Sequence, residues 1–275
     1  MTRSIFSFFS RREIVLTREE SDAFVEIIRD LVGQGDIKKA IHLSVGHQRK
    51  HPHDKPGICN SAIAISTAGR PDIAIQMLSK ANEDNPGEPR LIGNLGAAYY
   101  NNTQIEQSLE HARESVRLAP DSPNGTKLLA DVLCNLNETE EARALCANFL
   151  ENYDPDFMVR FKLGVCELQL GNFQEAANHF EQSLEMNPEH TSSLANLGAA
   201  LIGCGDFDKA ESIVLRVLEK YPDNGISICN LAQIFESREL YKDAYDLYCR
   251  SIEVDPNYEP AHGEAARLRE FLEIT

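Results

Sequence analysis

The sequence predicts an all-α protein built from a tandem array of helical pairs. Three observations point to this fold class: related segments recur at a fixed distance, apolar residues inside each segment follow a helical period, and no segment shows sustained period-two alternation. The segment NLGAAYYNNTQ begins at Asn94, and NLGAALIGCGD begins at Asn196, 102 positions later, which is three times 34. We therefore expect a 34-residue structural unit that repeats along the chain.

The 34-residue spacing divides the chain without an insertion. Full units are expected at 21–54, 55–88, 89–122, 123–156, 157–190, 191–224 and 225–258, with an N-terminal extension or capping segment in 1–20 and a capping helix in 259–275. A proline marks the end of each unit, one position late in the fourth: Pro52, Pro86, Pro120, Pro155, Pro188, Pro222 and Pro256. A small residue marks the middle of each unit: Ala40, Ala74, Ser108, Ala142, Ala176, Ala210 and Ala244.

The segment 191–224 shows how one unit forms two helices. Leu197 and Leu201 lie on one helical stripe of the first half. Gly205 then breaks the helix, and Asp206 can cap the next one. Pro222 ends the second helix because proline cannot continue the hydrogen-bond ladder. One such hairpin cannot bury its apolar stripe alone, so we expect neighbouring hairpins to stack.

Small residues also recur in the first helix of the unit. Gly96, Gly164 and Gly198 occupy one position there, and alanine takes the same place in other units. We expect these residues to face the recurring Ala or Ser of the second helix, because small side chains let two helix backbones approach closely.

Charge and cysteine content exclude several function classes. The chain carries 43 acidic and 27 basic side chains, a net charge of −16, which disfavours nucleic acid and anionic lipid as partners. Seven cysteines form no CxxC pair, so zinc ligation and a disulfide framework are both disfavoured. Scattered cysteines of this kind indicate small buried residues in a reducing compartment.

The N-terminal twenty residues contain a short apolar patch. Serines interrupt this patch and Arg11 and Arg12 end it, so no secretory signal is expected, and no other stretch is long enough to span a membrane. The chain is expected to be cytoplasmic. The patch and its flanking arginines allow two interpretations, a cap on the first unit or contact with a lipid surface through residues 1–12, and we favour the cap. The residues concerned are Arg3, Ile5, Phe6, Phe8, Phe9, Arg11 and Arg12.

The unit resembles the tetratricopeptide repeat. The stretch FKLGVCELQLGNFQEAANHFEQSLEMNP (161–188) matches that pattern almost throughout, and the similarity covers 21–258, with departures from the LG pair in the first two units. The resemblance implies a right-handed superhelix, an alpha-alpha solenoid whose first helices line a concave groove. VRFKLGV (159–165) is in addition faintly similar to a stretch of the self-assembling repeat protein of bacterial magnetosomes, although much of that match is family consensus.

The resemblance also implies where a partner binds. In several such proteins an Asn before the LG pair points into the groove, where its amide can bond an extended backbone. The matching residues here are Asn60, Asn94, Asn196 and Asn230. The alternative is that these amides only solvate a helix or bond to a neighbouring helix. Other predicted groove residues are Tyr100, Asn101 and Gln233, together with a basic strip formed by Arg90, Lys127 and Lys162. The Lys and Asn set of the chaperone-binding members is mostly missing, so that role is not expected.

Two charged residues and two histidines fall at unusual places. Arg160 and Glu167 occupy positions where other units carry apolar residues, so we expect them to pair with each other, pair with a neighbouring helix or reach solvent. A local hinge or a partner contact is the less favoured alternative. His47 and His51 share a helix face, but no carboxylate or cysteine completes a metal site, so a solvated turn is favoured.

The function predicted from these observations is a non-enzymatic scaffold that holds a protein or peptide segment in the groove. No phosphate loop, nucleophile elbow or HExxH motif occurs, and no cofactor is expected. Two alternatives stay open: a peripheral organiser of a membrane or organelle that self-assembles, and a regulatory subunit of an enzyme complex.

Overall fold

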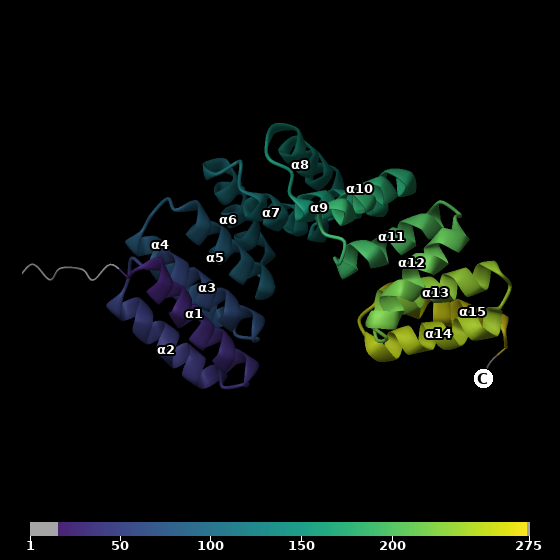
Figure 1. Ribbon diagram of the computed structural model, residues 1–275, viewed down its shortest axis with the longest axis horizontal. Coiled ribbons are helices and arrows are strands. Elements are labelled where there is room, and N and C mark those ends of the chain that lie inside the picture. The colour runs from purple at the N-terminus through teal and green to yellow at the C-terminus, as the bar shows by residue number, and fades with distance from the viewer. Residues whose placement is uncertain (1–15, 274–275) are drawn as a thin grey trace, which may run out of the picture. The chain divides into compact units, whose positions relative to one another are not determined.

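The computed structural model describes residues 16–273, and Figure 1 shows the order of the elements. These residues form fifteen α-helices joined by short turns, and the described part of the chain contains no strand. The helices fall into two compact units, each several repeats long, one on each side of the bond between Val132 and Leu133. From here on, the first and the second unit are these two parts of the chain. The predicted N-terminal patch in residues 3–12 lies outside the described residues.

The first unit contains six complete helices and most of a seventh. Their bounds are α1 (Arg18–Gly33), α2 (Ile37–Lys50), α3 (Lys55–Thr67), α4 (Pro71–Asp84), α5 (Pro89–Asn101), α6 (Ile105–Leu118) and α7 (Pro123–Asn135). The last turn of α7 belongs to the second unit. Side chains cap three of these helices: Thr17, Asp36 and Asp54 accept hydrogen bonds from the first turns of α1, α2 and α3.

The second unit contains eight further helices. Their bounds are α8 (Thr139–Asn152), α9 (Phe157–Gln169), α10 (Phe173–Met186), α11 (Thr191–Gly203), α12 (Phe207–Lys220), α13 (Gly225–Ser237), α14 (Tyr241–Val254) and α15 (Glu259–Phe271). From α3 onward each odd-numbered helix begins 34 residues after the previous one, as Lys55 and Pro89 do. The even-numbered helices keep the same interval from α2 onward, so the sequence period is also the period of the helices.

Helices that follow one another pack as pairs, and the first helices of consecutive pairs also touch. Contacts join α3 to α4 and α5 to α6 in the first unit, and α9 to α10, α11 to α12 and α13 to α14 in the second. In addition α3 touches both α1 and α5, and α11 touches both α9 and α13. Helices α1, α3 and α5 therefore lie side by side as one layer in the first unit, and α9, α11 and α13 do so in the second. The predicted binding face depends on this arrangement.

The turn between the two helices of each pair contains a residue in the left-handed conformation. Glycine occupies it in four pairs, at Gly35, Gly69, Gly171 and Gly205, with φ between 78° and 81°. Thr103, Asn137 and Glu239 take the corresponding place elsewhere, with φ of 59°, 62° and 62°. A side chain makes this conformation costly, by about 1–2 kcal/mol, although asparagine tolerates it, so the turns at Thr103 and Glu239 are strained.

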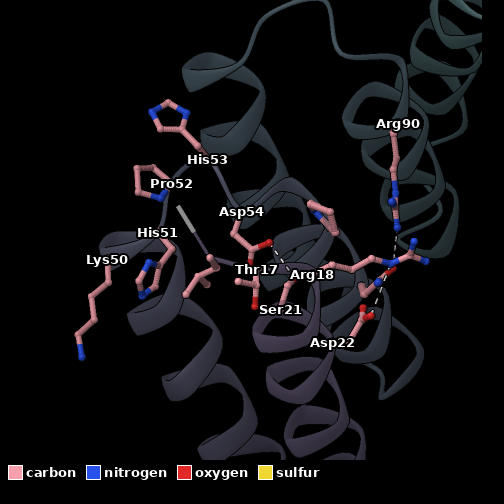
Figure 2. A pocket seen from close by; sticks show the side chains of 13 residues that line it. Thr17, Arg18, Ser21, Asp22, Lys50, His51, Pro52, His53, Asp54 and Arg90 are labelled. Carbon is pink, nitrogen blue, oxygen red and sulfur yellow. Dashed lines mark hydrogen bonds and ion pairs between the residues drawn. The ribbon is translucent and has the colours of Figure 1, made fainter. Parts of the chain in front are cut away.

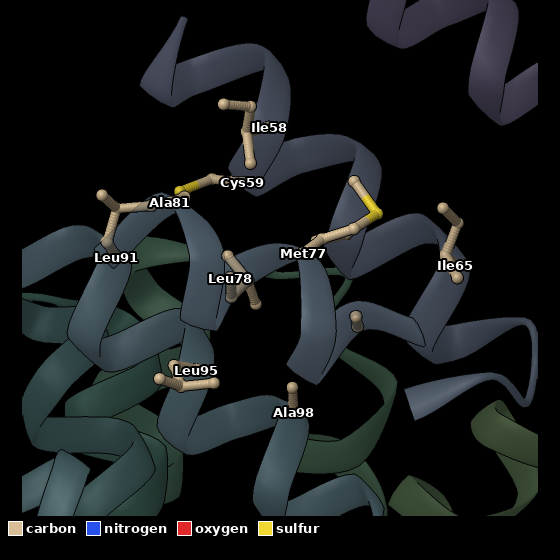
Figure 3. Close-up of a cluster of buried hydrophobic side chains, with 11 residues drawn as sticks. Ile58, Cys59, Ile65, Met77, Leu78, Ala81, Leu91, Leu95 and Ala98 are labelled. Carbon is tan, nitrogen blue, oxygen red and sulfur yellow. The ribbon is translucent and has the colours of Figure 1, made fainter. Parts of the chain in front are cut away.

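Apolar residues from both helices of a pair form the core of each unit. Figure 3 shows a cluster of the first unit, in which Ile58, Leu78 and Leu91 come from α3, α4 and α5 and are almost completely buried. A comparable cluster in the second unit surrounds Phe180 and Val214, which are also fully buried. Each such side chain contributes about 1.5–3 kcal/mol relative to an exposed one.

The structure corrects the expected partner of the small residues in the first helices. A Cβ on Gly164 would lie 2.8 Å from the ring of Phe180, and a Cβ on Gly198 would lie 2.9 Å from Val214. These neighbours come four positions after the recurring alanines, Ala176 and Ala210, which are themselves fully buried. Each glycine therefore provides room for a large side chain of the second helix, Phe180 or Val214.

A buried serine closes three of the helical pairs. Ser115, Ser183 and Ser251 lie near the ends of α6, α10 and α14, and each is at most 3% exposed. Each hydroxyl donates to the carbonyl of the first residue of its own pair, at 3.1, 2.9 and 2.9 Å respectively. The bond joins the start of the first helix to the end of the second, 26 residues later.

Candidate functional site

A polar stripe on α5 faces α3 in the first unit. Arg90, Asn94 and Asn101 are spaced by four and seven residues, so they lie on one side of the helix. At one end, Arg90 Nη2 donates to Asn60 Oδ1 on α3 at 3.0 Å. At the other end, Asn101 Nδ2 donates to Ser66 Oγ at 2.9 Å. The structure thus brings four predicted site residues together on two neighbouring first helices.

Asn94 lies in the middle of this stripe and has an unused donor. Its Nδ2 is buried and has no hydrogen-bond acceptor among the described residues, although the amide lies close to the Cys59 thiol, which is a weak acceptor. Burial raises the pKa of the Cys59 thiol, while Asn94 and Arg90 oppose that shift. A buried amide without a full acceptor costs about 1–3 kcal/mol, so hydrogen-bonding capacity is left unused at this position.

A cavity of about 670 Å³ adjoins one end of the stripe (Figure 2). Asn60 and Arg90 line it on one side, and the beginning of α1 and the connection between α2 and α3 form the rest. The other lining residues are Leu16, Thr17, Arg18, Ser21, Asp22, Lys50, His51, Pro52, His53, Asp54 and Pro56. The predicted binding residues of α3 and α5 therefore continue into a space large enough for a side chain of a bound segment.

The two acids of the cavity are already engaged. Asp54 has a side-chain exposure of 6% and accepts from Ser21 Oγ at 2.8 Å and from the Gly57 amide at 3.1 Å. Asp22 Oδ2 lies 3.7 Å from Arg18 Nε, an exposed pair worth little energy. Arg90 bonds only the neutral Asn60 amide among the contacts described, so a local positive charge remains in an acidic protein.

Ser21, Asp54 and His47 form a connected trio beside the cavity. Figure 2 shows the Ser21–Asp54 hydrogen bond, and His47 Nε2 donates to the other Asp54 oxygen at 2.6 Å. The carboxylate lies between the hydroxyl and the imidazole, whereas a hydrolytic triad places the imidazole next to the hydroxyl. His47 also stacks on Phe24, with ring centroids 3.8 Å apart. The trio therefore fastens α1, α2 and α3 and leaves the serine without a general base.

In the second unit the structure corrects the prediction for Asn230. Asn230 is only 3% exposed, and its Nδ2 donates to the carbonyl of Ala195 on α11 at 2.9 Å. The amide joins neighbouring first helices, which is the alternative interpretation, and a partner cannot reach it. Asn196 differs again, because its Nδ2 donates to the carbonyl of Ser192 within its own helix at 2.8 Å.

The structure shows no contact between the remaining predicted residues and Asn60, Arg90, Asn94 or Asn101 among the interactions described. Tyr100 and Lys127 are half-buried residues of the first unit. Lys162 Nζ lies 5.7 Å from the Phe161 ring centroid. Burial of His190 lowers the pKa of its imidazole, and the positive charge of Lys162 lowers it further. Gln233 lines a separate cavity of about 360 Å³ in the second unit. The basic strip of Arg90, Lys127 and Lys162 stays a prediction.

Glu167 is buried and paired, as one of the sequence alternatives predicts. Its Oε2 accepts from Asn172 Nδ2 at 2.7 Å, and its Oε1 lies 3.8 Å from Arg143 Nη1 on α8. Arg160 is half-buried, and its Nε has no acceptor among the described residues. Burial, with Arg160 acting in the same sense, lowers the pKa of His179.

Two sequence profiles described as tetratricopeptide repeat match residues 127–191 and 167–228. They fall on the helical pairs whose 34-residue period the structure shows. The chain is a tetratricopeptide repeat protein. This confirms the predicted family and the all-α solenoid class. The coarse function that goes with the family is a protein-interaction scaffold.

Among curated proteins, the tetratricopeptide chain is similar to segments of much longer relatives. It is 32% identical over 90 residues to the probable biofilm formation methyltransferase WspC of Pseudomonas putida. The aligned segment covers 32% of this chain and 21% of that protein. It is 26% identical over 159 residues to anaphase-promoting complex subunit 3 of Schizosaccharomyces pombe, which covers 57% and 24%. The chain thus spans about a quarter or less of the length of these relatives.

Solved structures share the fold at low sequence identity. The APC/C hetero-tetramer Cut9-Hcn1 has a TM-score of 0.72 at 17% identity, with 90% of this chain and 49% of that chain covered. The structure named MamA RS-1 has a TM-score of 0.51 at 17% identity, covering 61% and 94%. At these identities the likeness shows the fold alone. Within residues 16–273, no helix has the length and apolar content that crossing a membrane requires.

Sequence reasoning missed the cavity and the trio that borders it. The histidine-rich segment HQRKHPHD drew attention only as a possible metal site or turn. A capping signal was present, because Asp54 stands three residues before Gly57, and a Cβ at Gly57 would lie 2.1 Å from Asp54 Oδ2. Gly57 is therefore needed because the Asp54 carboxylate occupies the space of a Cβ. The sequence could indicate this only if the start of α3 were already known.

Proposed function

We propose that the first-helix face of the first unit binds an extended segment of a partner protein and that the chain acts as a non-enzymatic scaffold. The contact surface consists of Asn60 on α3 and of Arg90, Asn94, Tyr100 and Asn101 on α5. Asn94 carries the proposal, because the residue is only half-buried at the centre of this surface and its Nδ2 has no full acceptor within the described chain.

An extended peptide suits this face for a simple reason. A side-chain amide can donate to a backbone carbonyl and accept from a backbone amide at the same time. The hydrogen bonds from Arg90 to Asn60 and from Asn101 to Ser66 hold the flanking side chains in fixed positions on either side of Asn94. Fixed polar groups lose little conformational freedom on binding, so more of the interaction energy appears as affinity.

The relatives support a scaffold over an enzyme. One is named as a subunit of the anaphase-promoting complex, and another as a member of the BBSome complex, so both belong to multi-protein assemblies by name. The likeness to the methyltransferase WspC is confined to 90 residues, 21% of its length. In the chain itself, the Ser21–Asp54–His47 trio has the wrong connectivity for hydrolysis.

Site-specific photo-crosslinking tests where the partner binds. A photo-reactive residue in place of Ala97, on the α5 stripe, is compared with one in place of Gln76, an exposed residue of the second helix α4. In extract of the native host, we expect a discrete adduct from position 97 and none from position 76. Once the partner is known, Asn94→Ala is expected to weaken binding about tenfold, equivalent to about 1.4 kcal/mol.

Asn178→Ala on α10 is the matched control, because it removes the same amide from an exposed second helix. Its affinity is expected to equal that of the wild type. Unchanged affinity of Asn94→Ala, with unchanged helix content by circular dichroism, would refute the proposed site. Adducts from position 76 alone would move the partner to the second helices.

A further inference from the structure

Two cysteine side chains meet where the last turn of α7 approaches α9 in the second unit. Cys134 Sγ and Cys166 Sγ lie 3.8 Å apart, although 32 positions separate the two residues. Sulfur atoms in a disulfide are about 2.05 Å apart, so a change in side-chain torsions brings these atoms toward bonding distance. The chain between them contains the whole of α8.

The two cysteine residues differ in exposure to solvent. Cys134 is partly exposed, whereas Cys166 is only 1% exposed. A third cysteine, Cys146 on α8, is fully buried and close enough to Cys166 to act on it electrostatically. Cys134 is therefore the most accessible of these three cysteines to a small solute.

The Cys166 thiol is also held in its protonated form. The contact with Cys134, followed by burial, raises the pKa of the Cys166 thiol, so it stays protonated near neutral pH. Oxidants react with accessible sulfur that has thiolate character. The first oxidation therefore falls on Cys134, and Cys166 is in position to react with the product.

We propose that Cys134 and Cys166 form a modification site, a dithiol that hydrogen peroxide converts into a disulfide between α7 and α9. In the first step the Cys134 sulfur attacks the peroxide, the O–O bond breaks, and Cys134 sulfenic acid and water are formed. In the second step the Cys166 sulfur displaces the hydroxyl from that sulfenic acid, and its proton leaves with the hydroxyl as water. Two thiols lose two electrons, and one peroxide becomes two molecules of water.

An exposed cysteine elsewhere provides the contrast. Cys204 at the end of α11 is exposed, and its thiol donates to Gln174 Oε1 at 3.8 Å. Peroxide can oxidise this sulfur, but its described neighbour is an amide, which cannot form a disulfide. Comparing Cys134 with Cys204 therefore shows whether disulfide formation requires a neighbouring sulfur or only exposure to the oxidant.

Peptide mapping of the full-length protein tests the proposal. The protein is treated with hydrogen peroxide, the remaining thiols are alkylated, and the non-reduced digest is analysed by mass spectrometry. We expect one pair of peptides joined through Cys134 and Cys166, lighter by two hydrogens than the separate thiols and separated again by a reductant. Cys204→Ser is the matched control, and it should give the same cross-link.

Cys166→Ser should leave Cys134 as a sulfenic or higher acid, which a sulfenic-acid trap detects. The oxidised wild type should also unfold at a higher temperature than the reduced protein, because the cross-link restricts the unfolded chain. The proposal is overturned if Cys134 accumulates as a single-residue acid in the wild type. A bond from Cys134 to Cys146 or to a second molecule would overturn it equally, and these results do not depend on whether any variant folds.

Discussion

Replacing Gly164 with alanine tests the close packing of the helical pair α9 and α10. The new Cβ would lie 2.8, 2.9 and 3.1 Å from three ring atoms of Phe180, where ordinary contact begins at 3.4 Å. Phe180 is fully buried, and its ring centroid is 5.8 Å from that of Phe161, so the ring has little room to move.

The magnitude follows from two opposing terms. Overpacking a well-filled core costs about 1–3 kcal/mol. Alanine in place of glycine inside a helix returns about 1 kcal/mol. We therefore expect Gly164→Ala to lower the free energy of unfolding by about 1 kcal/mol, and at most by about 2 kcal/mol.

Gly263 in α15 provides the matched control in the same unit. No atom outside its own helix backbone lies within 4 Å of a Cβ built there, so only the helical term acts and Gly263→Ala should stabilise by about 1 kcal/mol. Urea unfolding followed by far-ultraviolet circular dichroism measures both variants. A Gly164→Ala protein that is stabilised as much as Gly263→Ala would refute the packing argument, because only the helical term would then be acting.

Three further predictions concern the second unit. Glu239→Gly should raise the free energy of unfolding by relieving a φ of 62°, and Gly171→Ala should lower it by about 1 kcal/mol. Changes of the same sign in the two variants would contradict the argument that a side chain strains these turns. Asn230→Ala should cost about 1–2 kcal/mol because the Ala195 carbonyl loses its donor, whereas Asn196→Ala should stay within a few tenths in the same urea titration. Burial lowers the pKa of His179 below 6.5, so the unfolded chain binds a proton that the folded chain refuses, and stability falls as the pH drops below 6.5. His179→Gln should remove that part of the pH dependence of unfolding, and an unchanged profile would argue against it.

Local features of the sequence were sufficient to predict the helices. Gly205 was expected to break a helix, and it does so with a φ of 78° just before α12. Pro222 was expected to end a helix, and α12 stops at Lys220. Both signals act through the backbone of a few neighbouring residues, so no knowledge of tertiary contacts is needed to interpret them.

Side-chain partners could not be predicted in the same way. Asn60 and Asn230 hold the same place in their repeats, yet one accepts from Arg90 and the other donates to the carbonyl of Ala195. The difference arises from what the adjacent helix offers, and the repeat period contains no information about it. The Cys134–Cys166 pair was missed for a related reason, because its separation of 32 residues does not match the 34-residue period.

The buried serines of α6, α10 and α14 have a consequence for how the array opens. Each hydroxyl and its carbonyl acceptor belong to one helical pair, so the bond survives when that pair separates from its neighbours. The pairs that precede them, α3–α4, α7–α8 and α11–α12, have Ala81, Phe149 and Val217 at that place. Fluctuations should therefore begin in alternate pairs, and amide hydrogens of α4, α8 and α12 should exchange with deuterium before those of α6, α10 and α14.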